Sequence, residues 1–337
     1  MSGPFKPIYP PRVLIVVTIP AGSTKSTHSA KVQYLVIDED SEGQRLDNFL
    51  LSKLKGVPKS LIYRVIRKGE VRINKGRAKP ERKLQAGDSV RVPPIRVSQE
   101  KPEVKPSGNL RSLLEASVLY ESKELMVVNK PSGLAVHGGS GISLGLIESL
   151  RQMRPENSFM ELVHRLDRDT SGCILVAKKR SMLVYLQGLF RGVKQIDKRY
   201  LALVRGRWPN RAKVIDASLQ KNELSSGERM VRVSLEGKPS KTEFDVVKRF
   251  EEVTLVQAKP ITGRTHQIRV HALHKGHPLV GDDKYGNDEF NKQMKKQGCR
   301  RLFLHAASLQ FMLPDGQSLL VQAPLPEELQ NFIDVLE

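Results

Sequence analysis

The side chains best suited to chemistry lie in a polar run of nine residues, His164-Arg165-Leu166-Asp167-Arg168-Asp169-Thr170-Ser171-Gly172, just before the apolar stretch Cys173–Ala177. Two carboxylates, two guanidinium groups and an imidazole surround a single apolar residue, so the run cannot belong to a hydrophobic core. Loops held by a rigid sheet often carry catalytic groups. Asp169, Thr170 and Ser171 also suit a surface turn with local side-chain to backbone hydrogen bonds, and we favour that interpretation for these three.

A second polar cluster is Thr262-Gly263-Arg264-Thr265-His266-Gln267-Ile268-Arg269-Val270-His271, at the start of a helix predicted over residues 265–275. Thr265 suits the N-cap, which places Arg269 about one turn into the helix. His266 and His271 are five residues apart with no glutamate between them, unlike the paired histidines of zinc proteases. We therefore predict no metal ligands here.

The charge balance indicates a polyanionic partner. The 337-residue chain has 56 Lys and Arg against 36 Asp and Glu, a net charge of +20. Phosphates that replace screening ions relieve the self-repulsion of such a chain, so nucleic acid is the first candidate. A membrane surface is disfavoured, because we find no basic amphipathic helix with a bulky apolar face and no run near the roughly 20 apolar residues of a membrane span.

Two cysteines, Cys173 and Cys299, are too few for a disulfide framework and lack zinc-site spacing. Such cysteine usage is typical of a cytoplasmic protein. The apolar segment Val13–Ile19 is flanked by prolines and is at the lower limit for a signal sequence. We expect residues 1–31 to form a disordered extension.

Residues 32–97 are predicted to form a small, strongly basic domain. A strand at Val32–Ile37 precedes a helix with apolar positions from Leu46 to Leu54, and Pro58 starts a second helix that ends at Gly69. Asn74-Lys75-Gly76 suits a hairpin turn, because glycine accepts positive φ. Between Lys53 and Leu84 there are 12 basic and 2 acidic residues, a net +10 that amounts to half the charge of the chain. The candidate nucleic-acid contacts in this stretch are Arg64, Arg67, Lys68 and Arg72.

The pattern changes after residue 97. The segment Pro93–Arg111 has four prolines, a glycine and no apolar periodicity, and residues 98–115 are predicted to form an extended linker. Residues 116–337 alternate short β-rich runs with irregularly placed helices, which favours an α+β domain with a mixed sheet. The predicted strands are Leu125–Val128, Cys173–Ala177, Tyr200–Val204, Thr242–Val247 and Val253–Ala258, and the other predicted helices are Ser181–Phe190 and Glu327–Leu336.

Four segments of the larger domain together resemble the RluA-type pseudouridine synthases. They are HRLDRDTSG, TGRTHQIRVH, Asn129-Lys130-Pro131-Ser132-Gly133 and RLFLHA at Arg301–Ala306, and the first of them is highly specific. The resemblance runs from about Val118 to the C-terminus, and residues 1–30 precede the start that the family leads us to expect. The helix, helix and hairpin of residues 32–97 resemble the S4 RNA-binding domain, named after a ribosomal protein.

The resemblance implies that specific uridines in large-subunit (23S) ribosomal RNA are flipped out and isomerised to pseudouridine, by cleavage of the C1′–N1 bond and reattachment at C5. Asp167 matches the catalytic aspartate. A carboxylate can stabilise a cationic sugar-like transition state or form a covalent adduct without a cofactor. Arg269 matches the arginine that pairs with this aspartate, and such a pair would keep the carboxylate ionised and aimed.

The remaining roles are implied by the same resemblance. Tyr200 matches the tyrosine that contacts the target base and is a candidate general base, although a strand tyrosine can also simply pack in a core. Arg165 matches an arginine that enters the RNA stack where the uridine leaves it. Leu309 is expected to line the uracil pocket, and Lys130 to support the fold. We expect a monomer that needs no cofactor and no metal.

Two other classes of function stay open on the sequence. A ribosome-assembly or RNA-binding platform explains the charge equally well, but it does not explain an acid and an arginine in two separate motifs. A metal-dependent nuclease could use Asp167, Asp169 and nearby histidines. The nuclease would shorten RNA and need divalent ions, whereas an isomerase conserves strand length.

Overall fold

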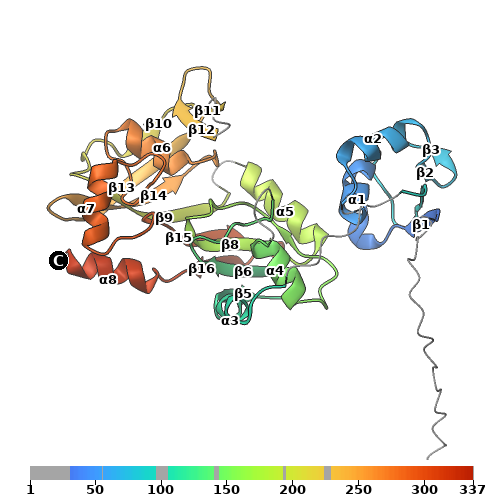
Figure 1. The fold of residues 1–337 in the computed structure, drawn as a ribbon, viewed down its shortest axis with the longest axis horizontal. Helices are drawn as coiled ribbons and strands as arrows, with labels where there is room; N and C mark the ends of the chain where they lie inside the picture. Colours follow the sequence, from blue (N-terminus) through green and yellow to red (C-terminus); the bar gives the residue numbers. More distant parts are fainter. Residues whose placement is uncertain are drawn as a thin grey trace, which may run out of the picture. The chain divides into compact units, whose positions relative to one another are not determined.

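The computed structural model describes residues 31–54, 56–95, 105–139, 144–192, 195–223 and 229–336. The described residues form two compact units, drawn in Figure 1. The N-terminal unit is built from residues 31–38 and 42–95, and the C-terminal unit from residues 105–336. The expected extension up to residue 30, the segment Val13–Ile19 and residues 98–104 of the expected linker lie outside the described residues.

The N-terminal unit packs two helices on a small antiparallel sheet of order β1-β4-β2-β3. In α2, the apolar side chains Ile62, Val65 and Ile66 are buried, while the basic side chains Arg64 and Arg67 are exposed. Gly69 ends the helix region with a φ of 72°. Along residues 31–95 the elements are β1 (Gln33–Val36), a 3-10 turn (Glu39–Ser41), α1 (Leu46–Lys53), α2 (Lys59–Arg67), β2 (Arg72–Ile73), β3 (Gly76–Arg77) and β4 (Ser89–Val92).

The predicted hairpin turn is present, but for a different reason. Asn74 and Lys75 carry the positive φ values, 49° and 69°, and Gly76 starts β3. A tight two-residue turn of this kind needs positive φ at both central residues, and asparagine tolerates it well. The Asn74 side chain stabilises the turn, since its amide donates to Asp88 at 2.7 Å and its carbonyl oxygen accepts from the Ser89 backbone N–H at 2.8 Å.

The C-terminal unit is built on a ten-stranded mixed sheet. Its main order is β10-β13-β14-β9-β15-β8-β6-β5, with β16 beside β15 and β7 beside β8. The strands are β5 (Val118–Glu121), β6 (Leu125–Lys130), β7 (Glu161–Leu162), β8 (Ser171–Ala177), β9 (Asp197–Arg205), β10 (Val214–Asp216), β13 (Lys241–Arg249), β14 (Val253–Pro260), β15 (Leu304–Met312) and β16 (Ser318–Gln322). A separate hairpin joins β11 (Leu219–Glu223) to β12 (Arg229–Val233).

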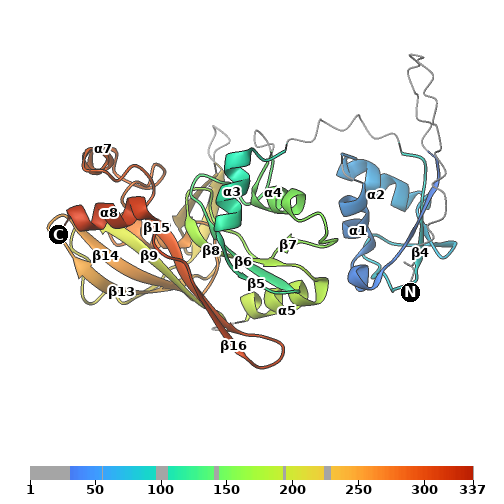
Figure 2. The same cartoon turned by 90° about the horizontal axis from the view of Figure 1, so that it is seen from below.

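Helices cover both faces of this sheet (Figure 2). At the β6–β8 end, α3 and α4 pack on one face and α5 on the other. At the β9–β14 end, α6 packs on one face, and α7 and α8 on the other. The helices are α3 (Gly108–Ala116), α4 (Leu146–Met153), α5 (Arg180–Arg191), α6 (Gln267–His274), α7 (Asp288–Lys296) and α8 (Glu327–Val335).

The two halves of the sheet meet where β8 runs parallel to β15. Ser171 pairs with His305, and Gly172 with Ala306. Gly172 has a φ of 109°, and a Cβ on it would collide with the Ala306 carbonyl oxygen. Only glycine allows this approach. Two of the sequence motifs, HRLDRDTSG and RLFLHA, are thereby brought side by side.

Two local predictions need correction. Residues 108–115 of the expected extended linker lie in α3, because Ser107 caps the Leu110 backbone N–H and Leu114 is fully buried. The helix predicted from Thr265 begins at Gln267 instead. Its N-cap residue is His266, which has a left-handed backbone, and no side chain caps the first turn.

Candidate active site

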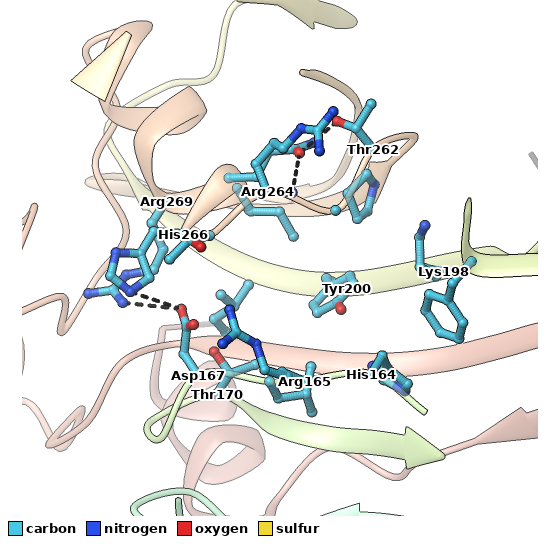
Figure 3. Close-up of a pocket in the computed structure, with 18 of the residues that line it drawn as sticks. His164, Arg165, Asp167, Thr170, Lys198, Tyr200, Thr262, Arg264, His266 and Arg269 are labelled. Atoms are coloured by element: carbon cyan, nitrogen blue, oxygen red, sulfur yellow. Dashed lines mark hydrogen bonds and ion pairs between the residues drawn. The ribbon is translucent and has the colours of Figure 1, made fainter. Parts of the chain in front are cut away.

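A cavity of about 820 Å³ opens on the C-terminal unit beside Asp167 (Figure 3). Among the described residues that line it, Asp167 is the only carboxylate, and five side chains are cationic: Arg165, Arg191, Lys198, Arg264 and Arg269. The walls are the loop before β8, the end of α5, β9, and the segment that joins β14 to α6. Such a lining suits an anionic substrate.

Backbone contacts hold the loop that carries Asp167. The Thr170 N–H donates to the Asp167 carbonyl at 3.2 Å and closes a turn. The Arg168 carbonyl accepts from the Gly133 N–H at 2.9 Å and from Lys130 Nζ at 2.8 Å. Leu166 is buried beneath the loop. The position of Asp167 is therefore fixed by its neighbours.

Lys130 has a structural part in this arrangement. It is fully buried, and its Nζ also donates to the carbonyls of Pro131 and Leu134 at 2.8 and 2.9 Å. Burial lowers the pKa of Lys130 to about 7, while three carbonyl acceptors favour the ammonium form. The Asn129–Gly133 segment thus supports the loop and does not line the cavity.

The side chain of Arg269 joins two carboxylates. Its Nη1 donates to Asp167 Oδ2 at 3.3 Å, and its Nε and Nη2 donate to Asp282 at 2.7 and 2.6 Å. Burial acts to lower the pKa of Arg269, but the hydrogen bonds and charge of Asp282, together with Asp167, outweigh burial and raise the pKa. The guanidinium is held in one orientation, with one edge toward the cavity.

Asp282 is a site residue that the sequence did not reveal. It is buried and also accepts the backbone N–H groups of Lys284 and Tyr285. The visible signal was an aspartate in a turn-like Gly281-Asp282-Asp283 sequence, which is common on surfaces. Its pairing with Arg269 depends on tertiary structure and cannot be read from spacing.

His266 also lies at the site, although its sequence pattern suggested no role beyond the rejected metal ligand. Its Nε2 is 3.7 Å from Asp167 Oδ2, and its Nδ1 is 2.7 Å from the Tyr285 hydroxyl. Figure 3 shows His266 beside Arg269, with both directed at Asp167. Tyr285 in turn lies under Arg269, with the guanidinium carbon 5.0 Å from its ring centroid.

Tyr200 lines the cavity from β9, on the same strand face as Lys198. In the sheet it pairs with Ala258 on β14 and with Ala306 on β15. Burial, and then the negative charge of Asp167, raise the pKa of Tyr200. The phenol is therefore protonated at neutral pH, which argues against a resting phenolate acting as a base.

Of the other two residues expected at the site, Arg165 lines the cavity and Leu309 does not. Arg165 is exposed at the cavity, and its guanidinium has no hydrogen-bond partner among the described residues. Leu309 pairs with Lys198 across the sheet, but its side chain is buried in a cluster with Phe311 and Val321 and does not line this cavity. The residue of β15 that does line it is Leu304.

On the N-terminal unit, the expected RNA contacts share one region. Arg64, Arg67 and Lys68 are exposed along the end of α2. Arg72 is exposed on β2, and it donates to the carbonyls of Gly69 and Lys75 at 3.3 Å each. The exposed basic side chains at the end of α2 are therefore followed by another on the β2–β3 hairpin.

Within the described residues, no helix is long and apolar enough to cross a membrane. Across that same part of the chain, no three His, Cys, Asp or Glu side chains are grouped so that they could hold a metal ion.

Two family models match the chain. The model described as RNA pseudouridylate synthase matches residues 124–274, and the S4 domain model matches residues 44–90. Two human proteins of known structure share the fold of the C-terminal unit. RNA Pseudouridylate Synthase Domain Containing 4 has a TM-score of 0.55 and 27% identity over 68% of this chain and 95% of that one. RNA Pseudouridylate Synthase Domain Containing 1 has a TM-score of 0.53 and 28% identity over 66% of this chain and 87% of that one.

Curated relatives are much closer in sequence. Ribosomal large subunit pseudouridine synthase C of Pasteurella multocida is 59% identical over 90% of this chain and 94% of its own length. The protein of the same name from Escherichia coli is 54% identical over 92% of this chain and 98% of its own length. Within the family, the S4-like unit in front of the four motif segments makes the chain look most like synthase C, and both of these relatives bear that name. The predicted α+β fold, with a mixed sheet behind a small S4 unit, is confirmed. With relatives this similar over about nine-tenths of its length, the chain belongs to the RNA pseudouridylate synthase family.

Proposed function

We propose that this protein isomerises specific uridines of large-subunit (23S) ribosomal RNA to pseudouridine, with Asp167 as the carboxylate that acts on the target nucleotide. The names of its relatives supply the RNA class. The observation that carries the role of Asp167 is that it is the one carboxylate among the described residues lining a cationic cavity, 3.3 Å from Arg269.

The reaction is an isomerisation and needs no oxidant or reductant. The C1′–N1 bond breaks, and its electron pair leaves with the uracil. After the base turns, a C1′–C5 bond forms, C5 releases its proton and N1 gains one. Asp167 has two possible parts in this sequence. It forms an ester at C1′ of the ribose or an adduct on the uracil ring, so that one fragment is bound covalently to Asp167 while the cavity retains the other, and the bond to Asp167 breaks again when the C1′–C5 product has formed.

The neighbours of Asp167 have distinct proposed roles. Arg269 aims the carboxylate through its 3.3 Å contact, and Asp282 aims Arg269. Tyr200 contacts the uracil as a neutral phenol that packs against the base and donates a hydrogen bond, because its raised pKa disfavours the phenolate. This assignment replaces the general-base role that the resemblance suggested. Leu304 takes the place expected for Leu309 as the residue of β15 against the base.

RNA binding is divided between the two units. Arg165, exposed and without a partner among the described residues, enters the stack where the uridine leaves it. On the N-terminal unit, the basic side chains Arg64, Arg67, Lys68 and Arg72 bind phosphates. Phosphate contacts position the RNA but carry little sequence information, so the choice of uridine depends on the shape of the folded RNA.

The test is Asp167→Asn with Asp169→Asn as a matched control. Asp169 lies two positions away in the same loop and pairs only locally, with Arg168 at 3.0 Å. On large-subunit RNA transcribed without modifications, we expect D167N to lose pseudouridine formation by at least about 10³-fold while RNA binding is retained. D169N should modify RNA normally. Nucleoside analysis and a sizing gel measure the outcome.

The other two classes of function give different results in the same assay. An RNA-binding platform predicts that wild type and D167N leave identical pseudouridine contents. A nuclease predicts shortened RNA that depends on divalent ions. Either result would overturn the proposal.

A further inference from the structure

His266 has a strained backbone that places its ring beside Asp167. Its φ of 53° and ψ of 21° lie in the left-handed region, which is unfavourable for a residue with a Cβ. Such strain persists only where the surroundings enforce it. Here the buried Gln267 enforces it, since its Oε1 accepts from the Arg264 N–H at 3.0 Å and from Thr262 Oγ1 at 2.7 Å.

The Tyr285 hydroxyl determines which nitrogen of His266 carries the proton. Tyr285 is 5% exposed, and its oxygen accepts the Val231 backbone N–H at 3.0 Å. A buried hydroxyl proton needs an acceptor, and among the described residues the one in reach is His266 Nδ1, at 2.7 Å. Nδ1 therefore accepts, and the proton of the neutral ring lies on Nε2. That N–H is the one that faces Asp167.

Two donors converge on the same carboxylate oxygen. Arg269 Nη1 is 3.3 Å from Asp167 Oδ2, and His266 Nε2 is 3.7 Å from that same atom. Asp167 Oδ1 has no side-chain donor among the described residues. The 3.3 and 3.7 Å separations at Oδ2 are long for hydrogen bonds, and catalytic hydrogen bonds that are long without substrate commonly shorten when the substrate binds. The two carboxylate oxygens of Asp167 therefore differ, because Oδ2 faces both donors and Oδ1 faces neither.

We propose that His266 is a positioning residue for this reaction: its Nε2–H, fixed by Tyr285, holds Asp167 Oδ2 together with Arg269, so that Oδ1 is the oxygen presented to the nucleotide. This inference rests on the proposed function, because it assigns His266 a task only if Asp167 does the chemistry. It also gives the β11–β12 hairpin a part in the site, since Val231 on β12 orients the Tyr285 hydroxyl.

The first experiment reads the tautomer directly. Full-length protein labelled with ¹⁵N-histidine gives the imidazole signals by NMR, and the His266→Gln variant assigns those of His266. We expect an Nε2–H tautomer in the wild type, and loss of that preference in Tyr285→Phe, which removes the hydroxyl proton. An Nδ1–H tautomer in the wild type would overturn the inference.

The charges around His266 supply a second NMR readout. Burial lowers its pKa, Asp167 and Asp282 act to raise it, and Arg269 and Lys284 act to lower it. Asp167→Asn should therefore lower the His266 pKa further. An unchanged pKa in D167N would show that the two side chains do not interact. This measurement does not depend on activity, so it stays informative even if Asp167 proves not to be catalytic.

The kinetic experiment compares His266→Gln with His266→Leu. Neither residue is β-branched, so both meet similar backbone strain, but only glutamine keeps an N–H donor near the position of Nε2. We expect H266L to lower the single-turnover rate about 10- to 100-fold, as for loss of a hydrogen bond to a charged group, with RNA affinity unchanged. H266Q should recover most of the rate.

The outcomes separate the two proposals. Equal rates in H266L and the wild type, or equal losses in H266L and H266Q, would overturn the role of His266 while D167N stays inactive. An active D167N would overturn the proposed function instead. Thermal melting of both His266 variants checks that they fold equally well.

Discussion

Arg269 is held more closely by Asp282 than by Asp167. Two hydrogen bonds of 2.6 and 2.7 Å join Arg269 to Asp282, against one of 3.3 Å to Asp167. The Asp282 side chain is fully buried and that of Arg269 is 8% exposed, so the pair is shielded from water. The guanidinium is thus oriented before any RNA arrives, and Asp167 meets a donor that is already in place.

Asp282→Asn is expected to impair both stability and activity. Removing one partner of a buried ion pair leaves the other charge uncompensated, and we expect a loss of about 3 kcal/mol in the free energy of unfolding. The single-turnover rate should fall because Arg269 is free to turn away from Asp167. Urea denaturation and pseudouridine formation measure the two effects. The control is Asp283→Asn at the exposed neighbouring position, and equal behaviour of the two variants would argue against the role of Asp282.

Arg165→Ala is expected to slow the reaction most on structured RNA. Extruding a uridine from a stacked helix costs a few kcal/mol, part of which a stacking guanidinium offsets, so the rate on folded RNA should drop on the order of 100-fold. On a short RNA with the uridine in an open loop, the loss should be much smaller. Arg168→Ala, which removes another exposed arginine of the same loop, should change neither rate. A uniform loss on both RNAs would point to phosphate binding instead.

Neutralising the basic side chains of the N-terminal unit is expected to reduce the salt dependence of RNA binding. Each side chain that no longer neutralises a phosphate lowers the slope of log K against log salt by up to about 0.9. The variant replaces Arg64, Arg67, Lys68 and Arg72 by glutamine, and RNA affinity is measured over a range of KCl concentrations. Four exposed lysines far along the chain, Lys275, Lys292, Lys295 and Lys296, provide a control with the same change in charge. Equal slopes for the two variants would contradict the assignment.

Acidification is expected to destabilise the protein through His305. Burial lowers the pKa of His305 to about 4, while in the unfolded chain it lies near 6.5. As pH falls from about 6.5 toward 4, the unfolded chain takes up a proton that the folded protein does not, so the folded state loses up to about 3 kcal/mol. Above this window the contribution is constant. Urea denaturation at pH 7 and pH 4.5 should show a smaller loss for His305→Gln than for the wild type, whereas the exposed His274→Gln should match the wild type.

Much of the fold follows from local patterns. The predicted strand Cys173–Ala177 lies within β8, and the predicted helix Ser181–Phe190 lies within α5, because buried runs and helical spacing mark such elements. α4 and α7 are absent from the predicted elements, although the buried pair Phe290 and Met294 in α7 follows helical spacing after the capping Asn287. These helices were readable from the sequence. The parallel pairing of β8 with β15 was not, since it joins segments far apart in the chain.

The site divides in the same way. Motif residues Asp167 and Arg269 are brought together, as their resemblance to the family implies. Asp282 and Tyr285 carry no recognisable pattern, because their function lies in contacts with side chains from other elements. For Leu309 the sequence suggested a site role, and the structure does not place its side chain in the cavity lining. An apolar residue beside a motif looks like pocket lining, but its side chain packs into the core with Phe311.

The parallel pairing of Gly172 with Ala306 also bears on how the enzyme is made. β15 occupies the middle of the sheet, with β9 on one side and β8 on the other. During synthesis, both neighbours emerge from the ribosome long before it does, and the edge positions that pair with β15 stay open until it arrives. The nascent chain therefore completes the sheet behind the Asp167 loop only after β15 has been made. We expect catalytic activity to appear in one late folding step. Until β15 is in place, the open edge positions of β8 and β9 can pair with a wrong strand, so the arrival of β15 ends the interval in which the sheet can mispair.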